Sequence, residues 1–190
     1  MLEKIPSAVG HALSGIRSGL EKITCYAELA ALPETIGLES PMFGNGELIP
    51  RRFTADGQGL SPPLQWSSVP ARAAALIILV EDADAPSPKP LVHCIVVDIP
   101  PENGSFNEGE LKGPAGEGAD HRLGENSFMK DEWLPPDPPP GHGLHRYIFQ
   151  IFALSSRPDF RENPGRGEVV DTARNHGIAK GVLLGTYKRD

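Results

Sequence analysis

Glycine and proline punctuate the whole sequence and limit the length of any regular element that it can form. The 190 residues include 21 glycines and 20 prolines, together more than a fifth of the chain. Proline ends strands and helices because it lacks the backbone N–H, and glycine favours turns. The sequence therefore predicts a mainly β fold with short elements and shaped loops, without long uninterrupted helices.

Composition and charge exclude several classes of protein. Hydrophobic residues make up 39% and charged residues 23% of the chain, which is close to globular usage and argues against disorder. The net charge of −7 offers no basic surface to a polyanion, so nucleic acid is not an expected partner. The two cysteines, Cys25 and Cys94, form no disulfide framework, and we expect a cytoplasmic setting. No stretch approaches the roughly 20 apolar residues of a membrane span.

The first part of the chain predicts an amphipathic helix over residues 2–23. Apolar residues recur there at spacings of three and four, with charged and small polar residues between them. Three glycines weaken this helix, so we expect it to pack on a surface, either its own domain or a second copy in a homodimer. We accordingly divide the chain into a helical extension over 1–30 and a domain over 36–190.

Within the domain, short apolar runs predict strands. Two of these runs are rich in isoleucine, valine and leucine, as expected for a sheet that is covered on both faces. One later stretch, over 169–183, has helical periodicity but is interrupted by glycine. The predicted strands lie at 47–54, 73–81, 91–99, 147–154 and 185–187.

Three polar segments stand where predicted strands begin or end, and they carry the candidate chemistry. The first is a pair of carboxylates directly after an apolar run. The second is a histidine inside a strand, where little water reaches it, so it needs a hydrogen-bond partner or a pocket. The third is a loop rich in proline and glycine that leads into another strand. Their candidate residues are Asp82, Asp84, His93, His145, Arg146 and Tyr147.

Each segment also has a plain structural interpretation. Aspartates before Ala-Pro commonly cap a turn, and a strand histidine is more often a satisfied core residue than a ligand. The pair His142 and His145 invites a metal site, but no HExxH motif or cysteine cluster accompanies it, so we expect no metal and no cofactor. Asp82 with His93 or His145 would suit the acid–base chemistry of a hydrolase or lyase, yet no GxSxG motif supplies a nucleophile.

Taken together, these motifs resemble those of the phosphatidylethanolamine-binding protein family, also called the Raf kinase inhibitor-like family. Residues 82–86 resemble its DPDAP signature, residues 138–147 resemble its PPxGxGxHRY segment, and His93 resembles its strand histidine. The Asn-Ser-Phe sequence at 126–128 is a further match in the expected order. The resemblance covers the domain but not the helical extension, and it is closest to bacterial and archaeal members.

The resemblance implies a β-sandwich with a large antiparallel sheet, a smaller sheet and a few peripheral helices. It also implies a shallow pocket for a small anion or a phospholipid head group, such as phosphate or phosphoethanolamine. Binding without catalysis is then the expected function, and inhibition of a kinase or a protease is a further role that the family suggests. The implied ligand-binding residues are Asp82, Pro86, His93, Trp133, Pro136, His145 and Tyr147, with Asp84 and Arg146 as structural support.

The sequence departs from the family pattern at four positions around this expected site. Ala83 replaces the proline of the signature, Cys94 replaces a tryptophan, and Met129 replaces the glycine after Asn-Ser-Phe. The fourth departure, Asp137, adds a carboxylate that disfavours an anion. A protonated histidine beside Asp82 offers charge-assisted donors, so we expect weak anion binding that strengthens as the histidines protonate.

Overall fold

The computed structural model of the chain describes residues 6–113 and 119–189 and contains two antiparallel sheets. The larger sheet has five strands, β3 (Ala75–Asp82), β4 (Leu91–Ile99), β6 (Arg122–Gly124), β7 (His145–Leu154) and β8 (Gly177–Tyr187), in the order β6-β4-β3-β7-β8. The smaller sheet has the order β1-β2-β5, formed by β1 (Gly37–Glu39), β2 (Leu64–Ser67) and β5 (Gly104–Phe106). The helices are α1 (Ser7–Leu13) and α2 (Arg166–His176), with 3-10 turns η2 (Leu20–Lys22) and η3 (Arg51–Phe53).

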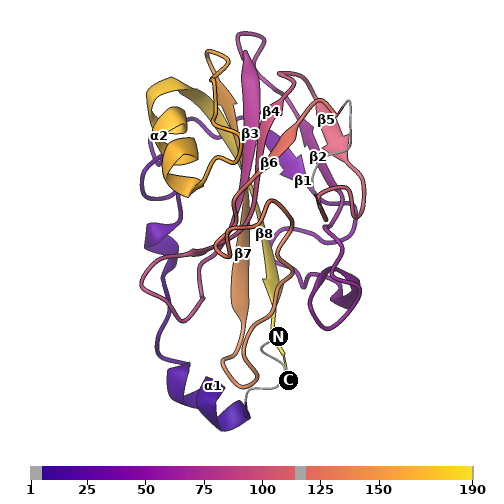
Figure 1. Cartoon of the computed structure of the whole chain (residues 1–190), viewed down its shortest axis with the longest axis vertical. Coiled ribbons are helices and arrows are strands. Elements are labelled where there is room, and N and C mark those ends of the chain that lie inside the picture. Colours follow the sequence, from indigo (N-terminus) through magenta and orange to yellow (C-terminus); the bar gives the residue numbers. More distant parts are fainter. Residues whose placement is uncertain (1–5, 114–118, 190) are drawn as a thin grey trace.

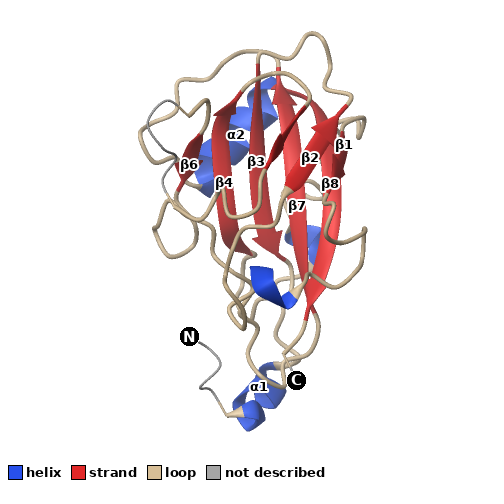
Figure 2. Ribbon diagram, turned by 90° about the vertical axis from the view of Figure 1, so that its right-hand side faces the viewer, coloured by secondary structure: helices blue, strands red, loops and turns tan. Residues whose placement is uncertain are grey.

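The large sheet is the middle layer of the molecule and is covered on both faces. The small sheet lies on one side of it and α2 on the other (Figure 1; Figure 2). One core cluster joins Phe149 of β7 to Trp66 of β2, and a second joins Phe152 of β7 to Val169 of α2. Because both faces are covered, β3 is buried along its whole length and is apolar from Ala75 to Val80. This mainly β architecture confirms the expected fold class.

The N-terminal helix is shorter than the sequence predicts. Residues 2–5 of the predicted stretch lie outside the described residues, and α1 ends at Leu13 instead of continuing to residue 23. The chain then runs to η2 through Gly19, whose φ of +100° belongs to the left-handed region that glycine tolerates best. Beyond it, Ile23 and Cys25 are fully buried in the core beneath the large sheet.

Two other elements differ from the sequence-based expectation. The predicted strand at 47–54 is wrong over much of its length, because the chain forms the 3-10 turn η3 directly after Pro50. The helix predicted over 169–183 ends at His176, and β8 starts at once with Gly177. Pairing of β8 with β7 along nearly its whole length outweighs the helical periodicity of its apolar residues. Among the described residues, no helix has the length and apolar character that crossing a bilayer requires.

Buried polar side chains tie the segment after η2 to the large sheet. Lys180 of β8 is only 5% exposed, and its Nζ donates to the carbonyl oxygens of Cys25 at 2.8 Å, Leu29 at 3.1 Å and Ala30 at 3.2 Å. A buried ammonium group is tolerated only where acceptors surround it. The three carbonyls supply that shell, so Lys180 holds this segment against the sheet edge.

Glu81 of β3 is a second buried charge, and it has a structural explanation. It is fully buried and accepts hydrogen bonds from Thr24 N at 2.9 Å, Gln150 Nε2 at 2.8 Å and Arg166 Nε at 2.7 Å. Both carboxylate oxygens are therefore engaged, which leaves this group no role in the candidate chemistry.

Replacing the buried ammonium group tests this account of the fold. Lys180→Met keeps much of the side-chain volume but removes three charge-assisted hydrogen bonds, so we expect the free energy of unfolding to fall by about 2–3 kcal/mol. Urea denaturation followed by circular dichroism measures the change. The matched control is Lys89→Met at an exposed loop position, which should stay near the unmodified protein. Equal effects of the two substitutions would contradict the anchoring role of Lys180.

Candidate functional site

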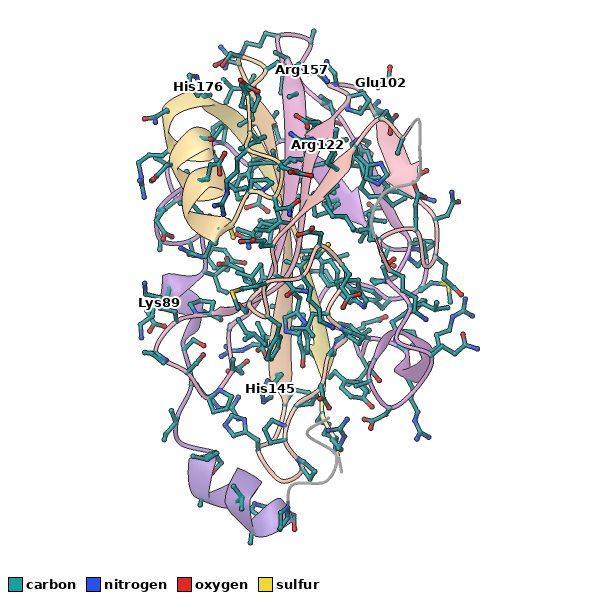
Figure 3. All side chains as sticks on the ribbon, viewed as in Figure 1. Lys89, Glu102, Arg122, His145, Arg157 and His176 are labelled. Atoms are coloured by element: carbon teal, nitrogen blue, oxygen red, sulfur yellow. The ribbon has the colours of Figure 1, made fainter. Side chains whose placement is uncertain are left out.

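The predicted site residues gather where three strand ends of the large sheet meet. β3 ends at Asp82, which pairs with Leu91 at the start of β4 and with Tyr147 near the start of β7. Because side chains alternate along a strand, His145 lies on the same face of β7 as Tyr147. Antiparallel pairing thus brings an acid, an imidazole and a phenol together from stretches far apart in the chain. Figure 3 shows His145 at this end of β7.

A hydrogen-bonded series of side chains runs outward from β3. His145 Nδ1 lies 2.8 Å from Asp82 Oδ2, and the other ring nitrogen of His145 lies 2.7 Å from His142 Nδ1. His142 Nε2 then lies 2.9 Å from the carbonyl oxygen of Leu13 and 3.2 Å from that of Ile16. His142, which the sequence suggested only as a metal candidate, is therefore a member of the cluster. Among the described residues, no group of three histidine, cysteine or acidic side chains is arranged to hold a metal ion.

The hydrogen-bond pattern fixes how many protons this series holds. A backbone carbonyl can only accept, so His142 Nε2 carries a hydrogen, and neutral His142 then accepts at Nδ1 from His145 Nε2–H. The contact between His145 Nδ1 and Asp82 needs one more proton. Three protons are thus shared between two imidazoles and one carboxylate. With three protons on two imidazoles and one carboxylate, the series is neutral overall.

Asp84, two residues after Asp82, binds Arg146 at the start of β7 and Arg17 from the N-terminal region. Its carboxylate accepts from the backbone N–H of Arg146 at 2.9 Å, from Arg146 Nε and Nη2 at 2.7 Å each, and from Arg17 Nη1 at 2.9 Å. Burial alone would raise the pKa of Asp84, but the hydrogen bonds from Arg146 and Arg17 outweigh burial and hold that pKa below its usual value. The backbone N–H of Asp84 also donates to Asp82 Oδ1 at 2.8 Å, which orients the carboxylate of Asp82.

A β-bulge sets the direction of His93. Val80 pairs with Cys94 and Glu81 pairs with Val92, so His93 is an extra residue on β4 that has no partner on β3. Simple alternation predicts that His93 and Cys94 face opposite sides, and this prediction is wrong. Cys94 shares a core cluster with Tyr147, whose ring meets the His93 ring edge-on at 5.1 Å. The bulge therefore turns two consecutive side chains to one face.

Two ring nitrogens beside this bulge have no hydrogen-bond partner among the residues that the structure describes. His93 Nδ1 donates to the carbonyl oxygen of Leu134 at 2.6 Å, but His93 Nε2 is buried and unpaired. Trp133 Nε1 is also buried and unpaired, and the two rings lie 6.3 Å apart. Burial lowers the pKa of His93, so in this state Nε2 presents a lone pair. Most buried polar atoms in folded proteins have a partner, so two unpaired nitrogens on neighbouring rings indicate a place for a polar group.

The proline-rich segment forms the rim of the cluster. Pro136 is buried, and its carbonyl accepts from Ala55 N at 2.9 Å. Asp137 forms an ion pair with Arg189 at 2.8 Å, and this pairing offsets the negative charge that would otherwise disfavour an anion. Pro86 is exposed in the loop after β3, and its contact with a ligand stays a prediction from the resemblance.

Proteins of known sequence and structure resemble this chain over most of its length. The sequence profile of the phosphatidylethanolamine-binding protein family matches residues 39–188. The chain belongs to this family. A UPF0098 protein of Aquifex aeolicus is 35% identical over 152 residues, which are 80% of this chain and 87% of that protein. A UPF0098 protein of Pyrococcus abyssi is 34% identical over 155 residues, covering 79% and 84% of the two chains.

Solved structures of family members share the fold. A phosphatidylethanolamine-binding protein homolog from Chlamydia trachomatis is 30% identical with a TM-score of 0.73, covering 83% of this chain and 99% of its own. YbcL of E. coli has the same TM-score at 23% identity, which shows the fold alone. The family match starts at residue 39, so α1 and its contact with His142 lie outside it.

One departure from the family pattern has a conformational consequence that can be measured. Met129 stands where the resemblance expects glycine, and its φ is +57°, in the left-handed region. Because this conformation strains an L side chain, Met129→Gly should raise the free energy of unfolding by about 0.5–1 kcal/mol. Urea denaturation checks this against Met42→Gly, another exposed methionine whose φ is not positive. We expect the control to lower stability, and a loss at both positions would contradict the strain.

The two buried histidines should make stability depend on pH. Burial is the main cause that lowers the pKa of both His93 and His142, so the unfolded chain binds more protons than the folded one below about pH 6.5. The free energy of unfolding should therefore fall as the pH drops below 6.5, by at most about 1.4 kcal/mol per pH unit for each group. Urea denaturation at several pH values measures the slope. His93→Gln should flatten it, and an unchanged slope would contradict this assignment.

Proposed function

We propose that this chain binds a small phosphate-type anion at the cluster of His93, Trp133, His145 and Tyr147. Phosphate groups occur free and in phospholipid head groups, and the same donors would recognise both. The proposal rests on the family membership together with the two unpaired ring nitrogens of His93 and Trp133.

The unpaired nitrogens supply the donors that such an anion needs. The indole N–H of Trp133 is a donor in every protonation state, and a protonated His93 would add a second donor at Nε2. Burial raises the pKa of Tyr147 well above its usual value, so its phenol stays protonated and can also donate. An oxyanion beside these groups would accept from the unpaired indole N–H of Trp133, and from His93 Nε2 once that ring is protonated.

The carboxyl group of Asp82 is compatible with an anion site because the series that it forms with His145 and His142 is neutral overall. This carboxyl group lies 2.8 Å from His145 Nδ1, and it accepts from the backbone N–H of Asp84. A carboxylate oxygen accepts more than one hydrogen bond, so an ammonium group near Asp82 would still find an acceptor. A zwitterionic head group that carries both charges suits this arrangement better than phosphate alone.

Catalysis by a thiol is not favoured by the same geometry. Cys94 is the cysteine nearest in sequence to the cluster, and burial raises the pKa of its thiol to about 12. The reactive thiolate would therefore be scarce at neutral pH. Binding without turnover remains the function that the site supports best.

Titration with ligands of graded charge tests the proposal. Trp66→Phe leaves Trp133 as the only tryptophan, so fluorescence reports from the site itself. We expect phosphate and phosphoethanolamine to change the emission and ethanolamine alone to leave it unchanged. Binding should tighten from pH 8 to pH 6, because a protonated His93 donates at Nε2 while the phosphate is still charged. An affinity that rises with pH would contradict this arrangement.

A second histidine substitution supplies the control. His93→Gln in the same background should weaken phosphate binding by at least about tenfold, a loss of roughly 1.4 kcal/mol for one charge-assisted hydrogen bond. His176→Gln changes an exposed histidine at the far end of the molecule and should bind like the parent (Figure 3). Vesicles that contain phosphatidylethanolamine distinguish a lipid head group from free phosphate as the source of the anion.

A further inference from the structure

We propose that residues 7–17, here called the N-terminal strap, close the anion site and must move before a ligand can enter. The inference rests on the proposed function for its ligand, but the closure itself is argued from contacts within the chain. In the described structure, His93, Trp133, His142, His145 and Tyr147 are each at most 3% exposed. A ligand from solvent therefore needs part of the surrounding structure to open.

The strap occupies the outer end of the histidine series. Carbonyl oxygens of Leu13 and Ile16 accept from His142 Nε2, so the strap takes the last donor that the series could offer to an anion. Arg17 adds a clamp, with Nη1 2.8 Å from the Leu144 carbonyl oxygen and Nη2 2.9 Å from the His142 carbonyl oxygen. These contacts hold the loop before β7 in the conformation that buries His142.

The backbones of the strap and the loop before β7 approach each other closely at two glycines. A Cβ atom added at Gly10 would lie 1.9 Å from the carbonyl oxygen of Pro140, far inside contact distance. A Cβ atom added at Gly141, whose φ is +79°, would lie 2.7 Å from the carbonyl oxygen of Ser7. Helix α1 therefore fits this loop only because side chains are absent at both positions. Figure 1 shows α1 against the loop that precedes β7.

Little apolar surface holds the strap in place. Gly10 is the only buried residue of α1, while Val9 and Ile16 are 43% and 51% exposed. Segments with few buried apolar contacts open at low free energy while the rest of the fold persists. The chain is bound more firmly directly after the strap, because the backbone N–H groups of Ser18 and Gly19 donate to the carbonyl oxygens of Ala85 and Ala83. The contacts thus divide the N-terminal region into a firmly bound part and a releasable part.

The strap is an addition to the shared domain. The family match begins at residue 39, and the chlamydial homolog aligns over 99% of its own length with only 83% of this chain. A gate built from these residues would therefore regulate access in this chain without altering the ligand-facing residues of the domain. Only open molecules can bind the ligand. The apparent affinity is therefore the intrinsic affinity multiplied by the fraction of molecules in which the strap is open.

A matched pair of glycine substitutions tests the gate. Gly10→Ala places a Cβ against Pro140 and should unseat the strap, whereas Gly15→Ala meets nothing within 4 Å and should leave it seated. Both variants are made in the Trp66→Phe background, and two measurements are taken on the full chain. The first, without ligand, is the rate at which diethyl pyrocarbonate modifies His142 and His145. The second is inorganic phosphate binding followed by Trp133 fluorescence.

We expect Gly10→Ala to raise the modification rate of His142 and to tighten phosphate binding, each by about tenfold if roughly one molecule in ten is open in the parent. Gly15→Ala should match the parent in both. Arg17→Gln, which removes the clamp without adding volume, should shift both measurements in the same direction as Gly10→Ala. This third variant keeps the test decisive if Gly10→Ala perturbs folding.

Each of three other results would contradict a different part of the proposal. Equal modification rates of His142 in the Gly10→Ala, Arg17→Gln and Gly15→Ala variants would show that the strap does not close the cluster. Faster modification with unchanged phosphate affinity would overturn the gate and leave the proposed function standing. Phosphate binding to none of the variants would overturn the proposed function and the gate with it, while the modification rates would still report whether the strap covers His142.

Discussion

The buried contact between Asp82 and His145 joins the end of β3 to the start of β7, and the rest of the site is arranged around it. Burying a carboxylate or an imidazolium alone is strongly unfavourable, so each needs the other and further hydrogen bonds as well. The backbone N–H of Asp84 completes one side and His142 completes the other. Arg146 holds both oxygens of the Asp84 carboxylate, and Arg17 adds an ion pair to it. The charged pair thus dictates the conformation of two loops.

The cluster divides into a satisfied half and an unsatisfied half. On the β3–β7 side, each described polar atom of Asp82, His145 and His142 has a partner, down to the carbonyl oxygens of the strap. On the β4 side, His93 Nε2 and Trp133 Nε1 have none. A purely structural cluster has no reason to leave two donors or acceptors unpaired in the same region, because each costs about 1–3 kcal/mol. This asymmetry is why we assign the ligand to the His93 side.

Sequence reasoning found the parts of the site that depend on strand ends. Asp82, His93 and His145 flank long apolar runs, so the polar residues at the termini of these strands could be expected to meet. The direction of His93 could not be foreseen, since the bulge depends on the register between β3 and β4. The partnership of His142 with Leu13 joins residues that are far apart in the chain, and no local pattern encodes it. The predicted N-terminal helix is present as α1, but it ends at Leu13 instead of residue 23, because glycines and a docking surface decide where it ends.

A strap held mainly by polar contacts suits a gate better than an apolar plug would. When the strap lifts, its carbonyls and the Arg17 guanidinium exchange protein partners for water, while Arg146 keeps both oxygens of the buried Asp84 carboxylate hydrogen-bonded. His142 loses its acceptors in the strap at the same moment, so its Nε2–H becomes available to an anion that is approaching the His93 side. Opening therefore both clears the approach and creates a donor. An apolar plug would expose surface in proportion to its area and would give the ligand no new partner.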